Sequence, residues 1–188
     1  MDNKIRCSWC LKDQLYMDYH DQEWGIAEHD DQKLFGMLQL EGAQAGLSWY
    51  TVLVKREGYY KAFDHFDPHK IIRYDEAYLE SLMEDKGIIR NRLKIWGVQK
   101  SAHAFLKVKE EFGSFDQYIW QFTDHKPIIN HWTETKQIPA TTKASDAMSK
   151  DLKKRGFKFV GSTICYAFMQ ACGMVDDHLV SCWRRTGG

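Results

Sequence analysis

The sequence has few of the features that mark membrane, secreted or disordered proteins. It contains no run of about 18 apolar residues that could span a membrane, and residues 1–12 carry charges but not the apolar stretch of a signal peptide. Only 3 of the 188 residues are proline, and no tract of biased composition occurs, which argues against disorder. We therefore expect one folded domain over residues 1–188, located in the cytoplasm and not associated with a membrane.

Net charge is also lacking, because 26 Lys and Arg balance 26 Asp and Glu. A nucleic-acid partner usually shows as a basic excess, so the composition gives no evidence for one. One local exception is the basic stripe, which we define as Lys150, Lys153, Lys154, Arg155 and Lys158. Such a stripe is either the solvated face of a helix, the commoner case, or a surface for phosphates.

Disulfides are not expected, because the 5 cysteines are odd in number and the cytoplasm is reducing. Cys7 and Cys10 are near the N-terminus, His20 follows, and His178 and Cys182 are one helical turn apart. Zinc takes sulfur and imidazole in tetrahedral sets of four, so one of these five would be spare, and spacing alone does not exclude Cys10. Buried thiols beside incidental histidines would give the same pattern. Four protein ligands would make the metal structural, a clasp between residues 7–20 and 178–182.

Hydrophobic periodicity predicts an all-α protein. Ser145 is the expected N-cap of one helix and Gly156 its stop. Only residues 157–160 have strand character, and residues 123–142 are expected to form the longest loop. The expected helices are residues 31–44, 51–63, 75–83, 95–106, 115–122, 148–155 and 160–173.

A glycine hairpin joins two of these helices, which predicts a helix-hairpin-helix around residues 79–106. Gly87 permits a tight reversal, and the free backbone N–H groups at the start of the second helix favour an anion. A DNA phosphate would suit that position, although an ordinary helix–helix turn has the same pattern. The hairpin is Lys86-Gly87-Ile88-Ile89-Arg90-Asn91.

One acidic residue occurs among many aromatic ones. Glu41 lies on an otherwise apolar helix, next to Leu40 and Ala43. Most aromatic side chains simply pack cores, but an unpaired buried carboxylate is costly unless a positive group approaches it. Aromatic faces and one acid would form a pocket for a flat cation. The aromatic residues concerned are Trp9, Tyr16, Tyr19, Trp24 and Trp49.

Four stretches resemble the bacterial 3-methyladenine DNA glycosylase I family, within the helix-hairpin-helix DNA glycosylase superfamily. Together they extend from Cys7 to Cys182, nearly the whole chain. They are Tyr19-His20-Asp21-Gln22-Glu23-Trp24-Gly25; Leu40-Glu41-Gly42 with Ala45-Gly46-Leu47-Ser48-Trp49; Gly87-Ile88-Ile89-Arg90-Asn91-Arg92 with Lys94-Ile95; and residues 153–161 through His178-Leu179-Val180-Ser181-Cys182.

The resemblance implies a base-excision repair enzyme that hydrolyses the N-glycosidic bond of 3-methyladenine in duplex DNA. It implies a helix-hairpin-helix fold whose termini are joined by one structural zinc on Cys7, His20, His178 and Cys182, with Cys10 spare. Glu41 would be the catalytic residue, hydrogen-bonded to the flipped purine. The expected base-pocket residues are Trp9, Tyr16, Tyr19 and Trp49, and the expected DNA-binding residues are Lys86, Gly87, Ile88, Arg90, Asn91 and Lys154.

Further expectations concern the reaction. Many relatives place a catalytic aspartate after the hairpin, and bifunctional ones add a Schiff-base lysine; neither pattern follows Ile95. We therefore expect a monofunctional, monomeric enzyme without a nucleotide cofactor that leaves an abasic site, with Leu47 or Gln44 filling the gap left by the base. One alternative is a zinc-stapled DNA-binding module without catalysis, which has no need of Glu41 among tryptophans. Another is a zinc hydrolase, which requires an open coordination position.

Overall fold

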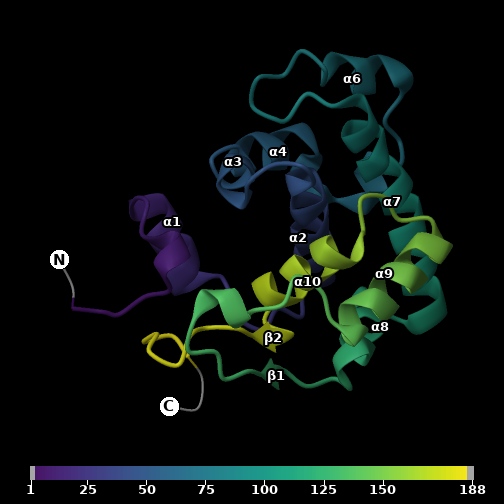
Figure 1. Cartoon of the computed structure of the whole chain (residues 1–188). Helices are drawn as coiled ribbons and strands as arrows, with labels where there is room; N and C mark the ends of the chain where they lie inside the picture. Colours follow the sequence, from purple (N-terminus) through teal and green to yellow (C-terminus); the bar gives the residue numbers. More distant parts are fainter. Residues whose placement is uncertain (1–2, 186–188) are drawn as a thin grey trace.

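The computed structural model describes residues 3–185, which are mostly helical, so the predicted all-α class is confirmed (Figure 1). None of the described helices is long and apolar enough to cross a membrane. The α-helices are α1 Gln14–Gln22, α2 Asp31–Gln44, α3 Trp49–Leu53, α4 Arg56–Ala62, α5 Pro68–Ile71, α6 Glu76–Ser81, α7 Arg92–Phe112, α8 Phe115–Trp120, α9 Lys143–Arg155 and α10 Ser162–Ala171. Short 3₁₀ turns occupy η1 Ser8–Cys10, η2 Asp64–Phe66, η3 Gln121–Thr123 and η4 Thr135–Gln137.

The core lies around α2 and α10, which pack against each other at the centre of the molecule (Figure 1). Helices α7, α8 and α9 cover one side, and α1 lies on the other side with both ends of the chain (Figure 1). Apolar residues of α2 and α10 are buried almost all round, as expected of helices inside a core. The largest fully buried side chains include Phe35, Phe63, Phe105, Phe115 and Phe168.

Several predicted helix boundaries were wrong, among them those of α7, which extends from Arg92 to Phe112 where residues 95–106 were expected. The helix expected over residues 51–63 is broken at Lys55, whose backbone is not helical (φ −105°, ψ 1°). The break directs α4 so that Gly58 lies against the backbone of Gly87, a tertiary contact that periodicity does not register. The N-cap of α9 is Thr142 and not Ser145; the two side chains form a reciprocal capping box, with Ser145 at the third helical position. The stop at Gly156 is confirmed, with φ at +102°.

The predicted strand character of residues 157–160 was also wrong, and the true strand pair was missed. Phe159 has a φ of +55°, which is incompatible with an extended strand, and it lies against Gly42 and Gly97. Within the expected loop, β1 Ile128–Ile129 instead pairs in parallel with β2 Val175–Asp176. Two-residue strands 47 positions apart carry no periodic signal that a sequence can reveal.

Candidate active site

Residues of η1, α1, α2, α3 and α10, with Trp24 and the segment 135–140, enclose the pocket that we call the aromatic pocket, which has a volume of about 350 Å³. Small-molecule sites have volumes of roughly 300–1,000 Å³. All five residues predicted from the sequence for base binding and catalysis line it, together with polar groups of α10. The lining residues are Trp9, Tyr16, Tyr19, Trp24, Glu41, Gln44, Trp49, Thr135, Ile138, Pro139, Ala140, Thr163, Tyr166, Ala167 and Gln170.

Glu41 is placed by α2, on its last turn, and only 3% of its surface is exposed. No described residue forms a hydrogen bond with its Oε2 atom. Burial away from any compensating charge raises the pKa of Glu41 to about 8. The pocket thus holds a carboxyl group that is readily ionised by a nearby cation, since opposite charge lowers the pKa of an acid.

The aromatic side chains form a connected wall beside this acid. The ring of Trp9 meets that of Tyr16 edge-on at 5.0 Å between centroids, and the rings of Tyr19 and Trp49 are 5.3 Å apart. Tyr16 is fixed in turn by packing on Tyr50, at 5.4 Å. Capping orders this region locally, because the Asp13 side chain accepts the Tyr16 backbone N–H and begins α1.

Two further polar atoms of the pocket are buried without a partner among the described residues. They are Gln44 Oε1 and Trp49 Nε1. Buried polar groups normally find hydrogen-bond partners, and those that do not point to a missing ligand or to strain. Together with Glu41, they give the pocket two unsatisfied acceptors and one donor. A neighbouring cavity of about 570 Å³ shares Tyr19, Glu41 and Trp49 but includes neither Trp9 nor Tyr16.

Sequence reasoning missed the α10 wall of the pocket. Tyr166 and Gln170 are one helical turn apart on α10, and both donate hydrogen bonds to the buried carboxylate of Asp177. The available signal was a pair of polar side chains at (i, i+4) spacing on an otherwise apolar helix. That spacing does not reveal their hydrogen-bond partner, Asp177, which directly follows β2 in the chain.

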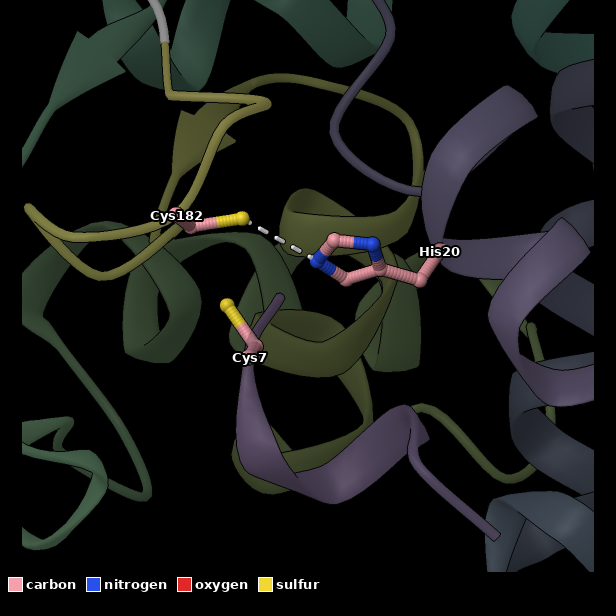
Figure 2. Close-up of side chains that lie close together, drawn as sticks. All are labelled: Cys7, His20 and Cys182. Atoms are coloured by element: carbon pink, nitrogen blue, oxygen red, sulfur yellow. Dashed lines mark hydrogen bonds between the residues drawn. The ribbon is translucent and has the colours of Figure 1, made fainter. Parts of the chain in front are cut away.

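Three of the four predicted metal ligands come together (Figure 2). One ligand atom each of Cys7, His20 and Cys182 lies within 4.8 Å of the others, and all three residues are buried. The Cys182 sulfur is 3.4 Å from His20 Nε2, and a hydrogen bond with Cys7 lowers the pKa of the Cys182 thiol. These residues come from the N-terminal segment, from α1 and from the C-terminal segment (Figure 2).

The fourth predicted ligand, His178, lies beside this group. Its ring centroid is 5.1 Å from that of His20, and its buried Nε2 has no hydrogen-bond partner among the described residues. The two imidazoles share a further feature: Nδ1 of His20 contacts Asp21 at 2.8 Å, and Nδ1 of His178 contacts Asp176 at 2.9 Å. Carboxylates at Nδ1 leave Nε2 as the metal-binding atom, the usual arrangement around zinc.

Cys10 is outside the group of three, and its buried thiol donates to the Cys7 carbonyl oxygen at 3.1 Å. The two ends of the chain also meet directly. The Trp183 backbone N–H donates to the Ile5 carbonyl at 2.9 Å, and the Trp183 indole N–H donates to the Asp21 carboxylate at 3.2 Å. The N-terminal and C-terminal segments are therefore in direct contact beside the group of three residues.

The hairpin follows α6 and ends at Asn91, the N-cap of α7, whose side chain accepts from the Lys94 backbone N–H. Several of its N–H groups are engaged within the chain, contrary to the expectation that they are free. Gly87 donates to the Asp85 side chain and Ile89 to the Tyr59 hydroxyl, at 2.7 and 3.3 Å.

The predicted DNA-binding residues of the hairpin differ in exposure. Lys86, Arg90 and Asn91 are exposed, whereas the Ile88 side chain is buried in the core and anchors the hairpin. Gly87 is not among the described glycines with positive φ, so its lack of a side chain serves close packing against Gly58 rather than a left-handed turn.

Two lysines near the hairpin have roles that the sequence did not suggest. Lys94 donates to the carbonyls of Ala43 and Ala45 at 2.8 and 2.7 Å, and so caps the end of α2 directly after Glu41. Lys55 donates to the Lys86 carbonyl at 2.6 Å and ties the hairpin to the start of α4.

The five residues of the basic stripe differ in whether their charge is paired within the protein. Arg155 is neutralised by ion pairs with Glu111 and Asp151, both at 2.6 Å, and stacks over aromatic rings. Lys154 is exposed, as are Lys150, Lys153 and Lys158. Arg155 thus holds α9 on α7, while the lysines remain available to solvent.

Comparison with known proteins adds independent findings. The family model described as methyladenine glycosylase matches residues 9–185. DNA-3-methyladenine glycosylase 1 of Escherichia coli (strain K12) is 52% identical over 177 residues, which cover 94% of this chain and 95% of that protein. A crystal structure of 3-methyladenine DNA glycosylase I is similar with a TM-score of 0.94 at 50% identity, covering 96% of this chain and 100% of the other. A variant of 3-methyladenine DNA glycosylase I, crystallised in complex with 3-methyladenine, has a TM-score of 0.91 at 34% identity, covering 94% and 95%.

Proposed function

This chain belongs to the methyladenine glycosylase family, and from that premise we propose that it excises 3-methyladenine from DNA in base-excision repair. The proposal rests on one observation: the carboxyl group of Glu41 is buried without a hydrogen-bond partner among the described residues, in a pocket lined by aromatic rings. A relative with the same fold has been crystallised with 3-methyladenine.

The chemistry of the lesion fits this pocket. Methylation at N3 places a positive charge on the adenine, and a flat cation is attracted to the faces of aromatic rings such as those of Trp49 and Trp9, by roughly 0.5–2 kcal/mol per ring. The same charge keeps Glu41 ionised despite its burial, so that the carboxylate accepts hydrogen bonds from the base. Neutral adenine receives neither electrostatic benefit.

Excision requires that the base leaves the helix stack, and a lesion that pairs poorly is easier to extrude. In the pocket the N9–C1′ bond breaks, its electron pair stays on N9, and the base departs as neutral 3-methyladenine. A water oxygen bonds to C1′ and its proton goes to solvent. Leu47 is 44% exposed in the loop after α2, and Gln44 lies at the pocket, so we propose that one of them fills the vacated position in the duplex.

The enzyme is proposed to be monofunctional. A Schiff-base lysine would have to reach the sugar of the flipped nucleotide, and no lysine is among the described residues that line the aromatic pocket. The expected product is therefore an abasic site in an unbroken strand.

We further propose that Cys7, His20, Cys182 and His178 hold one structural zinc. The donor set of two sulfurs and two Nε2 atoms fits its chemistry, and the unpaired Nε2 of His178 is what a fourth ligand would present. When bound, zinc would supply no reactive water, because four protein ligands close its coordination. These residues would join the N- and C-terminal segments.

The proposed partner is duplex DNA carrying the lesion. Exposed Lys86, Arg90 and Asn91 on the hairpin, and Lys154 on α9, are the groups proposed to contact phosphates. We also propose that the protein is a monomer. We propose that it acts in the cytoplasm, where its five cysteines, none of which forms a disulfide in the structure, would remain reduced.

The first test is to incubate the purified protein with alkylated duplex DNA and to separate the released bases by chromatography. Release of 3-methyladenine with the strand intact is the expected result. Strand cleavage without added base would contradict the monofunctional assignment. Binding of DNA without release of any base would favour the alternative of a non-catalytic DNA-binding module.

A further inference from the structure

Asp177 is a buried carboxylate that no step of the proposed excision uses. Only 1% of the surface of Asp177 is exposed, and side chains from two separate segments donate hydrogen bonds to its carboxylate. Asn130 and Trp132 each donate to Oδ1 at 2.7 Å, from the loop after β1. Tyr166 and Gln170 of α10 donate to Oδ2 at 2.5 and 2.8 Å. Asp177 thus joins the two segments that form one wall of the aromatic pocket.

This network fixes the orientation of the Gln170 amide. An ionised carboxylate accepts hydrogen bonds and donates none, so the amide nitrogen of Gln170 must face Asp177. The carbonyl oxygen, Oε1, is then the polar atom that this side chain can offer to a molecule in the pocket. No described residue donates a hydrogen bond to Gln170 Oε1.

Tyr166 is fixed in the same way. Burial, together with its hydrogen bond to Asp177, raises the pKa of Tyr166, so the phenol keeps its proton and directs it to the carboxylate. The pocket holds two further acceptors that are buried without a partner among the described residues, Glu41 Oε2 and Gln44 Oε1. These buried acceptors favour a base that presents N–H groups to them.

Charge and ring stacking alone do not separate two related lesions, and Glu41 can accept only one of the two N–H groups of a 6-amino substituent. 3-Methyladenine and 3-methylguanine are both flat cations, so the aromatic rings and the charge of Glu41 attract both. The two bases differ at the purine 6-position, where adenine has an amino donor and guanine has a carbonyl acceptor. Selection between them needs a polar group of fixed orientation.

We propose that Gln170, with its amide held by Asp177, is a specificity-determining residue: its Oε1 accepts a hydrogen bond from the amino group of a 6-aminopurine and leaves the carbonyl of a 6-oxopurine unpaired. This inference rests on the proposed function. Leaving one buried polar group unpaired corresponds to a preference of about 10- to 100-fold.

The test compares Gln170→Leu with wild type on duplex DNA that contains both 3-methyladenine and 3-methylguanine. Gln99→Leu is the matched control, because Gln99 is also half-buried and donates to two carbonyls, those of Ile71 and Tyr74, outside the pocket. Single-turnover release rates of the two bases are measured. We expect the ratio of 3-methyladenine to 3-methylguanine release to fall about tenfold or more in Gln170→Leu and to stay unchanged in Gln99→Leu. Equal losses on both bases in Gln170→Leu would show a merely structural role and overturn the proposal.

Asp177→Asn tests the orienting network itself. An amide at this position frees the Gln170 side chain to turn and present its Nε2, so the same ratio should fall in protein whose thermal unfolding is still cooperative. An unchanged ratio in folded Asp177→Asn would refute the role of Asp177. If wild type releases neither base, the proposed function fails; if it releases 3-methyladenine and the ratio is insensitive to both substitutions, only this inference fails.

Discussion

Glu41 shows how one side chain carries the chemistry of this site. The other polar side-chain atoms of the pocket belong to neutral groups, whereas Glu41 can respond to the charge of its ligand, because burial raises the pKa of its carboxyl group to about 8. A cationic base therefore changes the protonation state of the residue that binds it.

Replacement of this acid should reduce excision strongly. In Glu41→Gln the size of the side chain is kept and the negative charge is lost, so we expect a decrease in kcat/KM of about 10- to 150-fold, the equivalent of one charge-assisted hydrogen bond of roughly 1.5–3 kcal/mol. Release of 3-methyladenine from alkylated DNA is the measurement. Glu110→Gln, on the exposed side of α7, is the control and should retain wild-type activity.

Glu41 also predicts a pH dependence of stability. Its pKa is higher in the folded state (about 8) than in the unfolded chain (4.5), so its contribution is most favourable below pH 4.5 and is lost as the pH rises towards 8. The free energy of unfolding of wild type should fall relative to Glu41→Gln by up to about 1.4 kcal/mol per pH unit in this window. Urea denaturation at several pH values measures the difference, and parallel curves for the two proteins would contradict the assignment.

At the level of elements, the hairpin is held in place by contacts from distant segments. A Cβ atom on Gly58 of α4 would lie 2.2 Å from the Gly87 carbonyl oxygen, so α4 packs directly on the hairpin backbone. Lys55 and the hydroxyl of Tyr59, from the same region, bind the Lys86 carbonyl and the Ile89 N–H. The orientation of the hairpin depends on these contacts as much as on its own sequence.

Gly58→Ala should therefore displace the hairpin. We expect a loss of about 1–3 kcal/mol in the free energy of unfolding, typical of overpacking, and weaker binding to undamaged duplex DNA. Gly161→Ala is the matched control, since its added Cβ meets nothing within 4 Å. Fluorescence anisotropy with a labelled duplex and denaturant unfolding provide the two measurements; equal behaviour of the two variants would show that the contact does not position the hairpin.

For the whole molecule, Cys7 and His20 of the N-terminal part of the chain lie close to Cys182 and to the neighbouring His178 of the C-terminal part. Trp9 links the two sites, because its ring packs against His20 at 5.3 Å and lines the aromatic pocket. If these residues hold zinc, its binding free energy is part of the free energy of folding.

Cys7→Ser should lower the zinc content below one per chain and reduce the melting temperature by several degrees. Cys10→Ser is the matched control, as its thiol is equally buried but donates only to a backbone carbonyl; it should retain the metal. Elemental analysis and thermal unfolding, with and without a chelator, test this. Full zinc content in Cys7→Ser, or loss of turnover with unchanged folding on chelation, would contradict a structural clasp.

The sequence by itself determined the helical class, through 3.6-residue periodicity, and the stop at Gly156. Through the resemblance of its motifs to those of a known family, it also indicated the residues that line the aromatic pocket. Only the tertiary structure decided what depends on segments far apart in the chain. The pairing of β1 with β2, the break between α3 and α4, and the bond of Gln170 to Asp177 all arise from such contacts. Their physical reason is that a buried donor, acceptor or close backbone approach is satisfied by whichever group the fold brings near, and no local pattern specifies that group.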